Sequence, residues 1–174
     1  MSGKHAQVVA HGDIVCTRDA AKRLRCWRLS NRREIPWMDA VDSESRFERI
    51  WTRKTHVTSR SVEVCGLRAA EDARPGELTC YVADSSQDNV RMGRDPMPGV
   101  TFKAFAMGQD VCGLTRDTGE IRCAGGESPE TGRTRVPRGS FDDIVMADTL
   151  LCALDNFGRP HCADVIAPFA KRPL

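Results

Sequence analysis

The residues whose type and spacing most clearly indicate a chemistry are eight cysteines. In chain order they form four pairs: Cys16/Cys26, Cys65/Cys80, Cys112/Cys123 and Cys152/Cys162. The members of these pairs are separated by 9, 14, 10 and 9 residues. Cysteines of structural zinc sites usually stand about two to four residues apart, so zinc is the least favoured reading. An even number of cysteines at hairpin spacing favours four disulfides, with free thiols in a protein core as the alternative.

The other chemistry-bearing residues form no motif. The four histidines, His5, His11, His56 and His161, are isolated from one another along the chain. The sequence contains neither a phosphate-binding glycine loop nor the pattern of a nucleophile elbow. We therefore expect a protein that is not an enzyme, with no catalytic residue, no cofactor and no metal site.

Charge is distributed unevenly along the chain. The net charge is +2, yet residues 1–60 hold 13 Lys and Arg against 7 Asp and Glu. A basic run around Trp27 supplies the candidate partner-binding residues: Arg23, Arg25, Trp27, Arg28, Arg32 and Arg33. A solvated outer strand explains such a run most simply. A single nearby aromatic side chain gives little support for stacking on nucleic-acid bases, so nucleic acid is an unlikely partner.

The elements that must position the cysteines are β-hairpins. In the third pair, two short runs flank a turn at Gly119, which can adopt the positive φ that a tight hairpin needs. Side chains alternate between faces along a strand, so Cys112 and Leu114 share one face. Ile121 and Cys123 meet them on that face if the two strands pair around the turn. The pattern predicts a cross-strand disulfide in each hairpin.

This hairpin recurs four times. The first cysteines of the pairs are 49, 47 and 40 residues apart. The residue after each of them is small enough for close packing of another sheet: Thr17, Gly66, Gly113 and Ala153. Strands repeated at this period are typical of propeller blades. We predict an all-β, propeller-like single domain of four repeats, approximately residues 6–46, 47–100, 101–140 and 141–174, each built around a disulfide-linked hairpin.

The segments around the hairpins complete each expected repeat. Apolar runs that begin at Phe102 and Phe141 precede the last two hairpins and are predicted to form inner strands, whereas the run at Phe47 stands further upstream of its hairpin, in a looser register. The stretches 28–46, 82–100 and 124–140 are polar and are expected to be irregular outer strands and loops. Residues 69–76 are expected to form an exposed loop. Residues 163–174 are expected either to complete the blade that contains residues 6–10 or to reach another subunit.

The repeats carry a family resemblance. Cys112-Gly113-Leu114 with Cys123, and Cys152-Ala153-Leu154 with Cys162, resemble the cysteine-bearing bacterial repeats named after the regulator of chromosome condensation. Cys26-Trp27 matches the Cys-Trp that often closes that hairpin, whereas other residues replace the Trp in the later repeats: Tyr81, Ala124 and Ala163. The resemblance covers roughly residues 6–165. It implies a β-propeller that presents loops to partners, in a family that includes exchange factors, enzyme inhibitors and scaffolds.

Together these features predict a non-catalytic protein–protein interaction module outside the cytoplasm, periplasmic, cell-surface or secreted. The expected partner is a protein or a larger assembly in which the chain is a subunit or scaffold, and a homo-oligomer is one form of it. Residues 1–7 lack an apolar leader and no segment is apolar enough to span a membrane, so we expect a mature form. The alternatives are a secreted enzyme inhibitor that uses a loop such as residues 71–76, and a nucleic-acid-binding module that uses residues 22–33.

Overall fold

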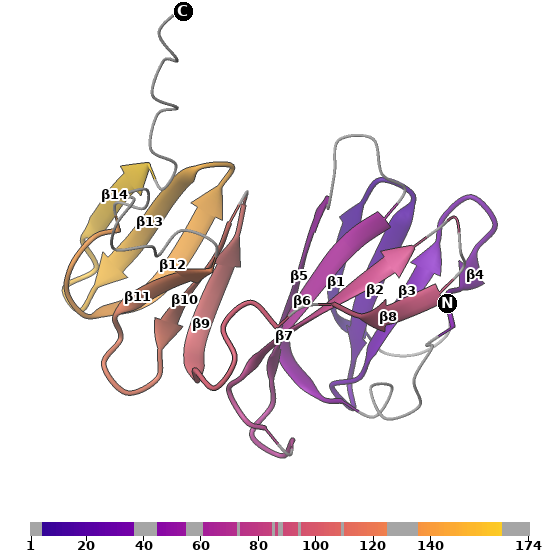
Figure 1. Ribbon diagram of the computed structural model, residues 1–174, viewed down its shortest axis with the longest axis horizontal. Coiled ribbons are helices and arrows are strands. Elements are labelled where there is room, and N and C mark those ends of the chain that lie inside the picture. Colours follow the sequence, from indigo (N-terminus) through magenta and orange to yellow (C-terminus); the bar gives the residue numbers. More distant parts are fainter. Residues whose placement is uncertain are drawn as a thin grey trace, which may run out of the picture. The chain divides into compact units, whose positions relative to one another are not determined.

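The structure of the chain is a computed structural model that describes residues 5–36, 45–54, 61–72, 74–84, 86, 89–93, 95–108, 110–124 and 136–164. Every regular element in these ranges is a β-strand (Figure 1). The first sheet contains β1 (His5–His11), β2 (Ile14–Asp19), β3 (Leu24–Arg28) and β4 (Arg33–Glu34). The second contains β5 (Phe47–Lys54), β6 (Ser61–Arg68), β7 (Leu78–Asp84) and β8 (Asn89–Met92). The third contains β9 (Phe102–Met107), β10 (Val111–Thr115) and β11 (Ile121–Ala124), and the fourth β12 (Phe141–Ala147), β13 (Leu150–Asp155) and β14 (Pro160–Asp164).

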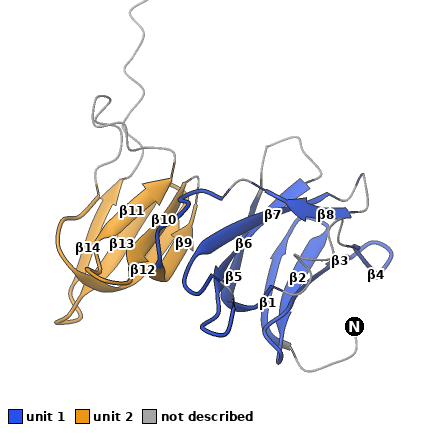
Figure 2. Ribbon diagram, turned by 60° about the horizontal axis from the view of Figure 1, so that its bottom comes forward, with its two compact units in different colours: residues 1–101 blue, residues 102–174 orange. Residues whose placement is uncertain are grey.

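The chain forms two compact units, each with two of these sheets (Figure 2). Unit 1 spans Met1–Thr101 and unit 2 spans Phe102–Leu174. All four sheets are antiparallel and follow one another along the chain, which confirms the all-β class and the four-fold repetition. The organisation as a single domain stays a prediction.

All four predicted disulfides are formed. In each sheet the two cysteines are directly opposite partners on neighbouring strands, with Cα–Cα distances of 3.9–4.1 Å. The turn glycines have the expected positive φ, 70° at Gly119 and 74° at Gly158. We call the side of each sheet that carries the cysteines its disulfide face, and the other side its opposite face.

Within each unit the two sheets pack in the same order. In unit 1, the disulfide face of the first sheet, with Cys16 and Cys26, packs on the opposite face of the second, with Val64 and Tyr81. In unit 2, the disulfide face of the third sheet packs on the opposite face of the fourth, with Leu151. The disulfide faces of the first and third sheets are therefore each buried by the next sheet along the chain.

The small residue after the first cysteine was expected to make room for another sheet, but in two repeats it makes room for a phenylalanine ring. A Cβ added at Gly66 would lie 2.2 Å from the ring of Phe47, and one at Gly113 would lie 2.5 Å from the ring of Phe102. Both rings belong to the first strand of the same sheet, so in these two repeats the space serves a neighbour within the sheet rather than another sheet. Each phenylalanine directly precedes a β-bulge, which lets its strand bend over the glycine.

The loop over residues 69–76 departs from the exposed loop expected from the sequence. Glu71 is exposed, but the carboxylate of Asp72 is almost fully buried and Gly76 is buried. Asp72 accepts hydrogen bonds from the backbone N–H groups of Arg46 and Arg74, at 2.9 and 3.1 Å. The loop is therefore fixed to the start of β5. Of the two expected roles for residues 163–174, neither is tested, because residues 165–174 lie outside the described residues.

Candidate interaction surface

Among the described residues, no sheet covers the disulfide face of the fourth sheet, whereas the corresponding faces of the first and third sheets are covered. Val145, Leu150 and Leu154 are 61%, 49% and 39% exposed. At the matching positions, Ala106, Ile14 and Leu114 are at most 3% exposed. We define the open face as the disulfide face of the fourth sheet, made of Val145, Leu150, Cys152, Leu154, Pro160 and Cys162.

The strand register places these residues on one side of the sheet. Val145 of β12 and Cys162 of β14 are the direct partners of Cys152 on β13, one on each side. Leu150 and Leu154 stand two residues before and after Cys152, so they point to the same side of the strand. The centre of the open face is thus apolar, with the disulfide in its middle.

Carboxylates border this apolar centre. Asp143 is the partner of Leu154 at one end, and Asp164 is the partner of Leu150 at the other. Both are exposed, and the Asp143 carboxylate accepts a hydrogen bond of 2.9 Å from the backbone N–H of Ile144. An apolar patch with charged residues at its rim is typical of a surface that binds another protein.

The turn between β13 and β14 is held in one conformation by Asp155. Its carboxylate accepts hydrogen bonds from the side chains of His161 and Arg159, at 3.0 and 2.9 Å, and from the backbone N–H groups of Phe157 and Arg159. The hydrogen bond with His161, together with those from Arg159 and Phe157, holds the pKa of Asp155 well below its usual range, against a smaller opposing effect of burial. Phe157 projects from this turn, and the Arg159 guanidinium lies 4.9 Å from the centre of its ring.

The basic run is divided between different parts of the first sheet. Arg23 pairs with Asp19, and Arg25 pairs with Glu34 across 3.6 Å. Trp27 is buried, so its ring is not an exposed platform for stacking. Arg28 is on the disulfide face, whereas Arg25 and Trp27 are on the opposite face; Arg32 and Arg33 are exposed. The structure does not gather these residues on one surface, and their binding role stays a prediction.

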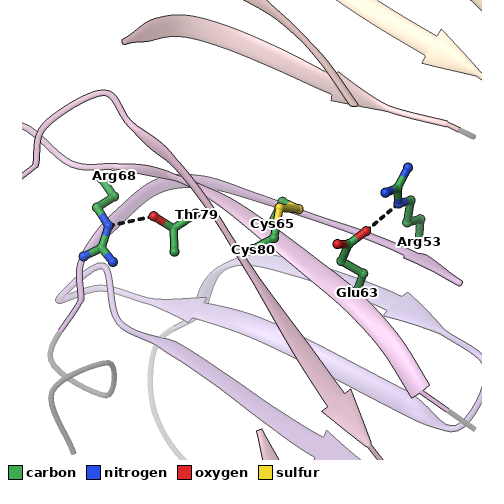
Figure 3. The surroundings of a disulfide bond; sticks show 6 residues. All are labelled: Arg53, Glu63, Cys65, Arg68, Thr79 and Cys80. Atoms are coloured by element: carbon green, nitrogen blue, oxygen red, sulfur yellow. Dashed lines mark hydrogen bonds and ion pairs between the residues drawn. A yellow bond between two sulfur atoms is a disulfide. The ribbon is translucent and has the colours of Figure 1, made fainter. Parts of the chain in front are cut away.

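Among the described residues, one group of side chains is close enough together to hold a metal ion. It consists of Glu63, Cys65 and Cys80, whose possible ligand atoms lie within 4.8 Å of one another. Both sulfur atoms are bonded in a disulfide, and the Glu63 carboxylate pairs with Arg53 at 2.6 Å (Figure 3). Disulfide sulfur is not the thiolate that binds zinc. This group is therefore structural.

Figure 3 also shows Arg68, whose buried guanidinium donates to Thr79 Oγ1 at 2.9 Å. It further donates to Ser45 Oγ at 2.8 Å and pairs with Asp72 at 3.0 Å. Burial acting alone would raise the pKa of Asp72, but the backbone donors and Arg68 lower it below its ordinary value. This network joins the loop to the second sheet and leaves Arg68 no role at the surface.

Sequence reasoning did not identify the open face. The run that begins at Phe141 is predicted to form an inner strand, and Leu154 has the same position after its cysteine as the buried Leu114. Exposure at these positions depends on whether another sheet covers them, and no residue within the repeat encodes that. Among the described residues there is also no helix of the length and hydropathy that crossing a bilayer requires.

Comparison by sequence finds no matching family model and no matching curated protein. By structure, the chain resembles the entire ectodomain of the receptor kinase CR4 from Physcomitrella patens, over 95% of this chain and 40% of that one, with 18% identity and a TM-score of 0.59. It also resembles the CRINKLY WD40 ectodomain of the Arabidopsis thaliana receptor kinase ACR4, over 92% and 51% of the two chains, with 18% identity and a TM-score of 0.56. A computationally designed protein, Ika4, matches over 95% of this chain and 93% of its own, with 11% identity and a TM-score of 0.51. The chain thus spans about half of the plant ectodomains or less, and its fold is that of a propeller-like β-protein.

Proposed function

We propose that this chain is a non-catalytic protein–protein interaction module that works outside the cytoplasm as a subunit or scaffold of a larger assembly. The observation that carries the proposal is the open face. Val145, Leu150 and Leu154 leave an apolar, disulfide-centred surface in water, while the same surface is buried by a further sheet in the first and third repeats. Burial of such a surface is favourable by about 25 cal/mol per Å² of apolar area, so a partner that covers it gains stability.

The setting outside the cytoplasm is supported by the cysteines. The structure uses all eight in four disulfides, and no cysteine is free. Disulfides persist in oxidising compartments and are rare where thioredoxin and glutathione keep thiols reduced. The two plant proteins of similar fold are receptor ectodomains, which agrees with this setting.

We also propose that the four repeats are related to the repeats named after the regulator of chromosome condensation. It is supported by Cys112-Gly113-Leu114 and Cys152-Ala153-Leu154 at the start of their hairpins, and by the glycine turns that follow. This relationship supports the use of the propeller as a surface for binding proteins. It does not identify a particular partner.

The two other functions expected from the sequence receive less support. An inhibitor that inserts residues 71–76 into an active site needs that loop to project, whereas the side chain of Asp72 is buried and bonded. A nucleic-acid module needs its cations on one surface, whereas Arg23 and Arg25 are paired with carboxylates and Trp27 is buried.

Hydroxyl-radical labelling of the native protein tests the proposal. Leu150 and Leu29 are 49% and 45% exposed, and they are the same residue type, so Leu29 is an internal control. In extracytoplasmic material labelled before purification, we expect much weaker oxidation of Leu150 than of Leu29, because a protein covers the open face. Equal oxidation of the two leucines would contradict an interaction through this face.

A further inference from the structure

We infer that a β-sheet of a different protein covers the open face, and that its first strand begins at the backbone carbonyl of Gly158. This inference rests on the proposed function and names the kind of partner that the same surface binds. Both units join their two sheets by the same backbone contact, and the fourth sheet presents one half of that contact.

In each unit, the hairpin turn of one sheet is bonded to the first residue of the next sheet. The carbonyl of Lys22 accepts a hydrogen bond of 2.8 Å from the backbone N–H of Phe47, where β5 begins. The carbonyl of Gly119 accepts one of 3.0 Å from the N–H of Phe141, where β12 begins. Lys22 and Gly119 each stand two residues before the returning strand of their hairpin, and both have a positive φ, 63° and 70°. A strand that covers a disulfide face therefore starts at this turn carbonyl.

Gly158 holds the equivalent place in the fourth sheet. It stands two residues before β14, and its φ is 74°. Its N–H donates to the carbonyl of Asp155 at 2.9 Å, as the N–H of Lys22 does to the carbonyl of Asp19. The carboxylates of Asp19 and Asp155 each accept from the backbone N–H and the Nε of the arginine four residues later. The fourth sheet thus has the same turn as the first, which receives a strand.

The surroundings of the two turn glycines differ. A Cβ built at Gly119 would lie 2.5 Å from Ser140 Oγ and 3.3 Å from the backbone nitrogen of Phe141. A Cβ built at Gly158 meets no described atom within 4 Å, and no described residue donates a hydrogen bond to the Gly158 carbonyl. A backbone acceptor at the edge of an apolar face can take the N–H of an added strand.

The strand that covers a disulfide face has the same apolar pattern in both units. Phe47 and Phe141 are followed three residues later by Ile50 and Ile144. All four are at most 4% exposed and belong to the core between the two sheets of their unit. In unit 2, this strand is β12, which packs on β9 and β10. By the same arrangement, the first strand of the partner packs on β12 and β13 and covers Val145.

Charge on the fourth sheet indicates a basic residue in the partner strand. In both units the residue after the phenylalanine is acidic and pairs with a lysine of the preceding sheet: Glu48 with Lys22, and Asp142 with Lys103 at 3.2 Å. Asp142 holds the position of Lys103 in the fourth sheet, because each is the extra residue of the β-bulge in its first strand. Asp143 adds a second carboxylate at the rim. Lys or Arg after the first apolar residue of the partner strand complements these charges.

The sheets of this chain are not suited to be the partner, because their own opposite faces are buried. Val15, Thr17 and Trp27 of the first sheet are at most 8% exposed. Phe105 and Val111 of the third sheet are 1% exposed. The opposite faces of the second and fourth sheets already cover the first and third sheets. The strand at Gly158 therefore comes from another protein.

Photo-cross-linking of the full chain in its native extracytoplasmic setting tests this inference. One variant is Phe157→p-benzoylphenylalanine, at a side chain that is 76% exposed and next to Gly158, and the other is Val145→photoleucine. We expect both to link to one protein other than this chain, at points within the length of one strand, which is 7 residues in β12 and 8 in β5. The link from position 157 should lie nearer the N-terminus of that segment. Lys or Arg should follow the first apolar residue of the segment.

The matched control is Leu29→photoleucine, which is exposed outside the open face and should give no link to that segment. The inference is overturned if either position gives no link, or if the two link to separate segments. It is also overturned by links to residues 165–174 or to a second copy of this chain. A link from position 145 alone to another protein would leave the proposed function standing with a partner that does not place a strand at Gly158. Absence of both links, together with equal oxidation of Leu150 and Leu29, would overturn the proposed function as well.

Discussion

At the scale of single residues, Arg68 shows how this small β-protein tolerates a buried charge. Its guanidinium bonds to Thr79, Ser45 and Asp72, and it lies 5.8 Å from the centre of the Phe47 ring. Burying a cation is costly unless such partners replace water. The network therefore fixes the loop over residues 69–76 at the expense of its freedom to reach a partner.

Replacing Asp72 with Asn should destabilise unit 1 by about 3 kcal/mol at pH 7, since it leaves Arg68 without its buried counter-ion. The pKa of Asp72 is lowered in the folded protein, so its ionised form stabilises the fold above the unfolded-state value. That contribution is lost as the pH falls through the folded-state pKa, and the difference between wild type and Asp72→Asn should shrink in acid. Denaturation followed by tryptophan fluorescence reports on unit 1, because all three tryptophans precede residue 102.

The matched control is Glu34→Gln, since Glu34 lies in unit 1, has a side chain that is 44% exposed and pairs with Arg25 at the surface. It should change the stability little. A difference between wild type and Asp72→Asn that stayed constant from neutral pH to acid would contradict the assigned role of the Asp72 carboxylate.

At the scale of strands and sheets, sequence reasoning reached the hairpins because their determinants are local. Cysteine spacing, alternation and a turn glycine such as Gly119 specify a pair of strands without reference to the remainder of the chain. The bulges after Phe47 and Phe102 and the burial of Asp72 were not predicted, because they depend on side chains from other strands. The partners of Arg68 are likewise spread from Ser45 to Thr79, beyond any local pattern.

The disulfides should differ in their access to reductant. Cys162 is exposed, whereas the cysteines of the first three sheets are at most 5% exposed. Thiol–disulfide exchange requires that a thiolate reach the sulfur it attacks. In the variant Val145→Asp, which places a charge in the open face, a small thiol should reduce Cys152–Cys162 first. Wild type bound to its protein partner should lose that bond more slowly, because the partner covers the open face.

Timed alkylation followed by peptide mapping measures the order of reduction in native conditions. Equal rates for all four disulfides, or earlier loss of a buried one, would be inconsistent with an exposed fourth disulfide. If Cys152–Cys162 is reduced at the same rate in wild type and in Val145→Asp, no partner covers this disulfide in wild type.

At the scale of the whole molecule, the order in which the sheets pack within each unit explains why we interpret the open face as a binding surface. In each unit the second sheet covers the disulfide face of the first, whereas the described residues leave the apolar disulfide face of the fourth sheet exposed. Four hairpins could be recognised from the sequence, but which faces remain uncovered could not, because cover comes from elements outside the repeat. The residues that interact are therefore ordinary apolar residues, Val145, Leu150 and Leu154, rather than a recognisable motif.

Sedimentation of the oxidised chain in native extracytoplasmic material tests most directly whether the open face is an interface. We predict a mass above 19.3 kDa for wild type and for Leu29→Asp, an exposed position outside the open face, and a mass of 19.3 kDa for Val145→Asp. A wild-type protein that sediments as a single chain, or a Val145→Asp variant that keeps the mass of wild type, would contradict this account.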